Sequence, residues 1–108
     1  MKKRILKSKP VCKVTFELPS QAVNGAVKVA LVGDFNGWNP ASTPMKRSRD
    51  GAYSITLDLP RDRKYQFRYL IDGERWENDW AADNYVRNPS GEGENSVVVT
   101  TAIKRSAT

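Results

Sequence analysis

The chain has 108 residues, of which 39% are hydrophobic and 28% charged. This composition is typical of one globular domain and argues against a disordered or membrane-embedded chain. The formal net charge of +6 raises the question of nucleic-acid binding. Seven of the 18 basic residues, however, lie near the two ends: Lys2, Lys3, Arg4, Lys7, Lys9, Lys104 and Arg105. The other 11 basic residues are balanced in number by the 12 acidic ones. We therefore expect the net charge to belong to flexible ends and nucleic-acid binding to be disfavoured.

The chain contains one cysteine, Cys12, and no histidine. An intramolecular disulfide is therefore excluded, as are a histidine general base and metal sites built from histidine and cysteine. The three apolar residues before Pro10 are too few for a secretory signal, and no apolar run approaches the roughly 20 residues that cross a membrane. We expect a cytoplasmic protein with no metal, no cofactor and no membrane contact.

The first half of the chain has a period of two, which is typical of strands. Residues 12–18 alternate between apolar and polar side chains and predict a half-buried strand. Residues 26–32 predict a second strand, which has Val27 on its inward face and is apolar enough on the other face to be covered on both sides. Residues 33–44 are rich in glycine, asparagine and proline, and predict a turn-rich segment that carries Trp38.

Two Asp-Gly dipeptides, at 50–51 and 72–73, predict tight hairpin turns. The first turn joins a short strand at 45–48 to a longer, cleanly alternating strand at 52–59. The second follows an alternating strand at 64–71, and we expect a short segment with Trp76 to return from it. These two hairpins account for the middle of the chain.

The alternation within 64–71 points Gln66 and Arg68 outward. Residues 77–93 are polar and rich in turn formers, so we expect a long loop there, and loops of this length are often functional. The β-branched run at 96–103 predicts the last strand.

Short strands with turns about every ten residues, and without helical periodicity, predict an all-β fold, an immunoglobulin-like antiparallel β-sandwich of about seven strands. We assign residues 11–103 to this domain, residues 1–10 to a basic, flexible N-terminal tail and residues 104–108 to a C-terminal tail. Functional residues are then expected on loops or on one exposed sheet face.

A catalytic site is disfavoured by the residues present. Two carboxylates could form a glycosidase site, and five acidic residues cluster in sequence: Asp72, Glu74, Glu77, Asp79 and Asp83. Asp72, however, is expected in a turn and the others in a solvated loop, and so small a domain has little bulk to enclose a dry cleft. We therefore expect no enzymatic activity.

The three tryptophans, Trp38, Trp76 and Trp80, all fall in predicted loops or at strand ends, where a core tryptophan is less expected than in mid-strand. An indole offers a rigid apolar plate on which the C–H face of a sugar ring can lie, while its hydroxyls reach polar neighbours. Arg68, outward on its strand, and Asn95, just before the last strand, are candidates for those neighbours. From composition alone, a role in capping the sandwich stays equally open for each tryptophan.

Three blocks of the sequence resemble carbohydrate-binding module family 48, the isoamylase N-terminal or early-set domain. The blocks are VALVGDFNGW at 29–38, YQFRYLIDGERW at 65–76 and GENSVV at 93–98, and the resemblance covers about residues 11–99. The family includes the glycogen-binding domain of AMP-activated protein kinase beta subunits, and the chain resembles small stand-alone bacterial proteins of this type more than it resembles that domain. The resemblance implies a non-catalytic module that binds α-1,4-glucan as polysaccharide or oligosaccharide: glycogen, starch or maltodextrin.

The resemblance also implies a shallow site made of two tryptophans, a basic residue and an asparagine. Motif by motif, these positions fall on Trp38, Trp76, Arg68 and Asn95. A leucine that the kinase domain inserts into the sugar is matched here by Gly91. Trp80 has no counterpart, and both a replacement sugar contact and a core cap stay open for it. The alternative is a scaffold module that binds a glucan-metabolising enzyme and has lost sugar binding.

Overall fold

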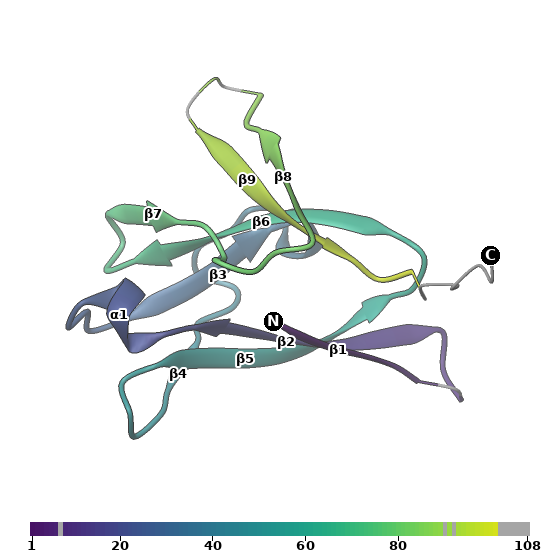
Figure 1. Cartoon of the computed structure of the whole chain (residues 1–108), viewed down its shortest axis with the longest axis horizontal. Coiled ribbons are helices and arrows are strands. Elements are labelled where there is room, and N and C mark those ends of the chain that lie inside the picture. The colour runs from purple at the N-terminus through teal and green to yellow at the C-terminus, as the bar shows by residue number, and fades with distance from the viewer. Residues whose placement is uncertain (7, 90, 92, 102–108) are drawn as a thin grey trace.

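The computed structural model describes residues 1–6, 8–89, 91 and 93–101, and it consists of two antiparallel sheets packed face to face (Figure 1). Sheet A has the order β1-β2-β5-β4, formed by Lys2–Ile5 (β1), Val11–Leu18 (β2), Tyr53–Pro60 (β5) and Lys46–Arg47 (β4). Sheet B has the order β3-β6-β9-β8, with β7 also paired to β6, formed by Val29–Gly33 (β3), Lys64–Ile71 (β6), Glu94–Val99 (β9), Asn84–Arg87 (β8) and Arg75–Glu77 (β7). In Figure 1 the β8–β9 hairpin projects from sheet B on the side away from sheet A.

The predicted all-β, immunoglobulin-like antiparallel sandwich is confirmed, with nine strands in the described residues rather than about seven. Strands β2, β5 and β6 lie where the alternation predicted them, and both Asp-Gly turns connect hairpins, β4–β5 and β6–β7. Strand β9 begins two residues earlier than predicted, so Asn95 lies within it. The ends of the predicted last strand and of the domain, residues 102 and 103, and the predicted tail at 104–108 lie outside the described residues.

The predicted flexible N-terminal tail is in part a strand. Residues Lys2–Ile5 form β1, which pairs antiparallel with β2 along its free edge. Ile5 packs against the core, and the Lys3 Nζ donates to a carboxylate oxygen of Asp83 at 2.7 Å and to the carbonyl oxygen of Val99 at 3.0 Å. Because these contacts join sheet A to sheet B, local composition did not reveal them.

The predicted long loop at 77–93 also contains a strand, β8, which pairs with β9. Only four residues long, it lacks a clear alternation of apolar and polar residues. The Tyr85 hydroxyl anchors it to the preceding segment by donating to the carbonyl oxygen of Asp79 at 2.6 Å. Long-range pairing, rather than strand propensity, decides this element.

The prediction for residues 26–32 was wrong at its start. A helical turn, Ser20–Val23 (α1), buries Ala22 and Val23, and β3 begins only at Val29. Val27, expected inward, is 84% exposed. The expectation that this strand is covered on both faces holds for Val32, which is fully buried on the outward side of β3.

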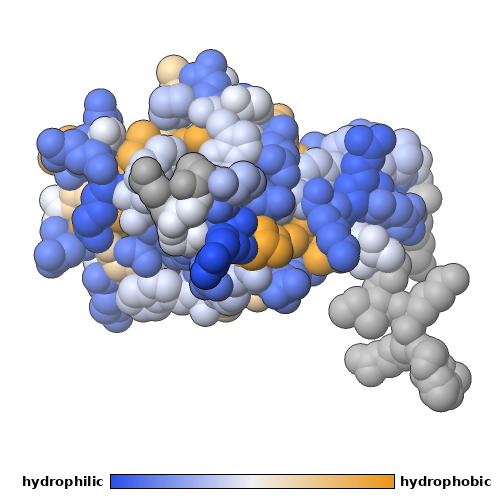
Figure 2. All heavy atoms as spheres, turned by 90° about the horizontal axis from the view of Figure 1, so that it is seen from above, coloured by the Kyte–Doolittle hydropathy of each residue, from blue (hydrophilic) through white to orange (hydrophobic). Residues whose placement is uncertain are grey.

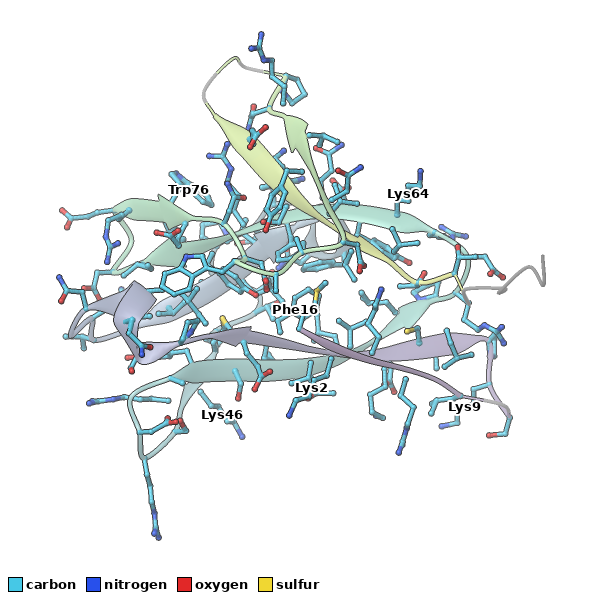
Figure 3. All side chains as sticks on the ribbon, in the orientation of Figure 1. Lys2, Lys9, Phe16, Lys46, Lys64 and Trp76 are labelled. Atoms are coloured by element: carbon cyan, nitrogen blue, oxygen red, sulfur yellow. The ribbon has the colours of Figure 1, made fainter. Side chains whose placement is uncertain are left out.

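Aromatic rings fill the space between the sheets. The ring of Phe16 lies between them in Figure 3 and meets the ring of Phe67 edge-on, with centroids 5.0 Å apart. The Tyr69 hydroxyl, also buried, donates to a carboxylate oxygen of Asp79 at 2.6 Å, and burial together with that carboxylate raises the pKa of Tyr69 far above its ordinary value. In the described part of the chain, no helix has the length and apolar character needed to cross a bilayer.

Candidate functional site

The outer face of sheet B, which points away from sheet A, carries two of the predicted site residues through strand register. Arg68 lies on β6, and two residues further on Leu70 pairs directly with Trp76 of β7. Because paired residues and residues two apart share a face, Arg68 and Trp76 point to the same side. Trp76 is 45% exposed, and in Figure 3 it lies on the side of sheet B away from sheet A.

Asn95 faces the same side, because it lies two residues before Val97, which pairs with Gln66 of β6. Only 3% of Asn95 is exposed. Its Nδ2 donates to the Gln66 Oε1 at 2.9 Å, and its Oδ1 accepts from the Asn88 Nδ2 at 3.1 Å. Asn95 therefore connects two amide side chains beneath the surface and exposes little of itself.

Trp38 reaches this region from the turn-rich segment, after the 3-10 turn Asp34–Asn36 (η1). Its indole Nε1 donates to the Asp34 Oδ1 at 2.9 Å, and the Asp34 Oδ2 accepts from the backbone N–H of Gln66 at 2.7 Å. One carboxylate thus ties the partly exposed indole of Trp38 to β6. Trp38 has a φ of 60°, a left-handed conformation that is rare for a large side chain and is held here by its position in the turn.

Asn36 orders the turn-rich segment. Its Oδ1 accepts from the backbone N–H of Gly33 at 3.1 Å, and its Nδ2 donates to the carbonyl oxygen of Leu31 at 2.9 Å. Gly33 itself is required at this point, because a Cβ there would lie 2.6 Å from the carbonyl oxygen of Gln66. The segment that carries Trp38 is therefore held closely against β6.

A cavity of about 430 Å³ brings Trp38 and Asn95 together, and its lining residues are Asp34, Trp38, Gln66, Asn88, Pro89 and Asn95. Arg68 reaches toward the β8–β9 hairpin, because a methyl group placed on Gly93 would lie 3.3 Å from its Nη2. Along β6, Gln66 beside this cavity and Leu70 beside Trp76 are separated by roughly 13 Å at the usual rise per residue. Arg68 lies midway between them on the strand.

A second hollow of about 390 Å³ lies between β3, the turn-rich segment and the β6–β7 turn. It is mostly apolar, and its lining residues are Lys28, Val29, Ala30, Pro40, Ala41, Pro44, Leu70 and Gly73. Since Leu70 pairs with Trp76, this hollow adjoins the tryptophan end of the face. Viewed from the side of sheet B, the surface is mostly hydrophilic, with apolar residues in small groups (Figure 2).

Trp80 is placed differently. It is 59% exposed, and its Nε1 donates to the Glu77 Oε2 at 3.3 Å. Glu77 pairs with Tyr69, whose side chain is buried between the sheets, so this contact lies on the opposite side of β7 from Trp76. The structure thus does not bring Trp80 together with the other candidates, and its role in sugar binding stays a prediction.

Sequence reasoning missed three polar residues of the cavity, Asp34, Gln66 and Asn88, as well as Pro89. A signal existed for Gln66, because the alternation that put Arg68 outward put Gln66 there as well. Asp34 belongs to the first block of the resemblance, but its residue type is that of an ordinary turn residue. Asn88 could not be found, because the pairing of β8 with β9 brings it to Asn95.

Three of the acidic residues that cluster in sequence each have a separate structural partner. Asp72 accepts from the backbone N–H groups of Val27 and Lys28, both at 2.9 Å, and so has a structural role in its turn. Asp79 is buried against Tyr69, and Asp83 pairs with Lys3. Among the described residues there is no group of three or more histidine, cysteine or acidic side chains that could hold a metal ion.

Comparison with protein families matches residues 13–86 to carbohydrate-binding module 48 (isoamylase N-terminal domain). The chain belongs to this family. It is accordingly a carbohydrate-binding module, and the resemblance noted in the sequence is confirmed. The matched range contains Trp38, Arg68 and Trp76, whereas Asn95 lies beyond it. No curated protein sequence matches the chain.

Proposed function

We propose that the outer face of sheet B binds α-1,4-linked glucan, as glycogen, starch or maltodextrin, without catalysing its cleavage. The observation that carries this proposal is the common face of Arg68, Trp76 and Asn95 beside the cavity that Trp38 lines. Membership of a carbohydrate-binding family supports it independently. The proposal assigns each of these residues a separate task.

Trp38 and Trp76 supply the apolar plates. Each indole is accessible, and the two lie at opposite ends of the stretch of β6 that Arg68 divides. A curved oligosaccharide can stack a ring on each plate and lay its hydroxyls over the strand between them. Arg68 then donates hydrogen bonds from a planar, permanently charged group that can bond two oxygens at once.

Asn95 has a supporting task in this proposal. With 3% of its surface exposed, it has little area for a sugar to cover. Its two hydrogen bonds instead fix the amides of Gln66 and Asn88, which line the cavity beside Trp38. We expect these two amides to make the polar sugar contacts that were predicted for the family asparagine.

The outward residues on the strands of sheet B argue against hydrolysis. In the described part of the chain, none of the side chains that alternate onto this face from β3, β6, β7, β8 and β9 is an aspartate or a glutamate. The cavity has one carboxylate, Asp34, and both of its oxygens already accept hydrogen bonds. A glycosidase needs two carboxyl groups about 5 to 10 Å apart with free access to the bond.

A shallow, solvated site stacks few rings and removes little polar hydration, so we expect Kd values from micromolar to millimolar, about −8 to −4 kcal/mol. The test is a calorimetric titration with maltoheptaose and β-cyclodextrin, with cellohexaose as the matched β-linked control. We expect heat and a change in tryptophan fluorescence with the two α-linked ligands alone. No binding of either at several millimolar, or equal binding of cellohexaose, would refute the proposal.

A further inference from the structure

The outer face of sheet A carries an unbalanced set of cations. Strand β1 pairs with β2 so that Lys2 lies opposite Thr15 and Arg4 lies opposite Lys13. These side chains point away from sheet B, because the alternate position Val14 is fully buried between the sheets. In Figure 3, Lys2 and Lys46 both lie on this side of the molecule.

Arg4 and Lys13 face each other directly across strands β1 and β2. Like charges at paired positions destabilise a sheet. Lys13 is compensated by the Asp58 Oδ1 at 2.9 Å, but no ion pair joins Arg4 or Lys2 to a carboxylate in the described part of the chain. A bound anion over this end of the face would relieve the repulsion between Arg4 and Lys13.

The basic and acidic residues of the whole molecule are also distributed unevenly between the two sheets. The segments that build sheet A and its turns, 1–27 and 45–63, hold ten basic and four acidic residues among those described. The segments that build sheet B and its loops, 28–44 and 64–101, hold five basic and seven acidic ones. The net charge away from the chain ends is therefore close to zero only as an average, because the sheet A half is basic and the sheet B half is slightly acidic.

A cavity extends the basic face at the end where the β1–β2 and β5–β6 turns meet. It has a volume of about 530 Å³, and its lining residues are Pro10, Val11, Pro60, Arg61, Asp62 and Arg63. The backbone N–H of Arg61 donates to the carbonyl oxygen of Pro10 at 3.2 Å, which joins the two turns. The Arg61 Nε is buried and has no hydrogen-bond partner within the described residues. A buried donor without an acceptor is costly, so an anion at this cavity would be stabilising.

We propose that this basic face, formed by Lys2, Arg4, Lys13 and Lys46 with the cavity at Arg61, binds an acidic segment of a partner protein. Carboxylates of that segment bond Arg4 and Arg61, and its backbone lies along the strands of sheet A. The sugar face is on the opposite sheet, so the module can hold a glucan and an acidic protein at once. Only this last step rests on the proposed function.

Nucleic acid fits the face less well than an acidic polypeptide. The outward positions on the strands of sheet A hold no aromatic residue in the described chain, whereas single strands are bound largely by base stacking. Glu17 and Asp58, which lie among the cations, would repel a continuous row of phosphates, but they can pair with a lysine or arginine of a mixed protein surface.

The test uses a fluorescein-labelled peptide of about 20 glutamates and a DNA duplex of similar charge, with anisotropy read at about 50 and 200 mM NaCl. The variant Lys2→Glu/Arg4→Glu reverses the basic face, and Lys28→Glu/Arg87→Glu is the control with the same net charge on the sheet B half. We expect about tenfold weaker peptide binding for the first variant and less than about threefold for the second. Equal losses would mean that only net charge matters, and would overturn the proposal.

A second variant, Arg61→Ala, has no substitution in β1. It therefore tests the basic face even if the substitutions at Lys2 and Arg4 unfold that edge strand. We expect it to weaken peptide binding by at least about threefold, with unchanged far-ultraviolet circular dichroism and unchanged maltoheptaose binding. Unaltered peptide binding by a folded Arg61→Ala protein, no peptide binding by the unmodified protein, or tighter binding of the DNA than of the peptide would each refute the proposal. Because no sugar is present in the peptide titration, its failure is distinguishable from failure of the glucan site.

Discussion

Replacing Trp76 by alanine is expected to weaken glucan binding about 30-fold while the protein remains folded. Trp76 is 45% exposed, so of an indole side chain of roughly 250 Å² about 110 Å² is free for a ligand to cover. At about 25 cal/mol per Å², covering all of this exposed area would contribute roughly 2.8 kcal/mol, and a sugar ring that covers most of it contributes about 2 kcal/mol. This free energy corresponds to a loss of about 30-fold in affinity for Trp76→Ala.

The cost to stability is expected to be smaller than that of a core substitution. Truncating a fully buried tryptophan costs about 3 to 5 kcal/mol, and because nearly half of Trp76 is exposed we expect roughly 2 kcal/mol. Affinity is measured by calorimetry with maltoheptaose, and the free energy of unfolding by urea denaturation followed by circular dichroism. The two measurements separate the loss of a sugar contact from general unfolding.

Trp80→Ala is the matched control, because Trp80 is 59% exposed and its hydrogen bond to Glu77 lies on the other side of β7. We expect a similar cost to stability and an affinity within about threefold of the unmodified protein. If both variants lose affinity equally, or if Trp76→Ala binds unchanged, the placement of the sugar on the outer face of sheet B is wrong. A loss confined to Trp80→Ala would identify Trp80 as the sugar contact instead.

Three further predictions concern the support of the site and the core. Asp34→Ala removes the acceptor shared by the Trp38 indole and the Gln66 backbone, so we expect about three- to tenfold weaker maltoheptaose binding and a shifted Trp38 emission; unchanged affinity would contradict this positioning role. Gly33→Ala places a Cβ 2.6 Å from the Gln66 carbonyl oxygen, so we expect a loss above about 3 kcal/mol in urea denaturation, and a loss under about 1 would contradict the packing. Burial raises the pKa of the Cys12 thiol, so the unfolded chain ionises before the folded one; we expect stability to fall as the pH rises above about 9, and thiol reagents to react only after denaturation. If thiol reagents react with Cys12 at full rate in the folded protein, the core around Cys12 opens readily and the prediction is wrong.

Much of the fold could be read from local pattern. Strands β2, β5 and β6 have the period of two because one face of each meets the core, and this period also places Arg68 outward. The two Asp-Gly turns were recognisable because glycine accepts positive φ, as at Gly73 with a φ of 71°. These features depend on residues that are neighbours along the chain.

The site could be predicted only in part. Arg68 and Trp76 share a face by local register around one hairpin, which sequence spacing describes well. The burial of Asn95 could not be foreseen, because Gln66 and Asn88, 29 and 7 residues away, supply its hydrogen bonds. The contact between Asp34 and the Gln66 backbone of β6 could not be predicted from the turn-rich segment either, because the two residues are 32 positions apart in the sequence.

The sequence by itself determined the alternating strands, their turns and the family motifs, since each of these is a property of a short stretch of chain. Only the tertiary structure decided that residues Lys2–Ile5 form β1 and that Lys3 reaches Asp83, 80 residues away. The same pairing collects the basic side chains on sheet A. A composition average cannot show this, because charge separation depends on which strands lie side by side, and contacts between distant segments decide that arrangement.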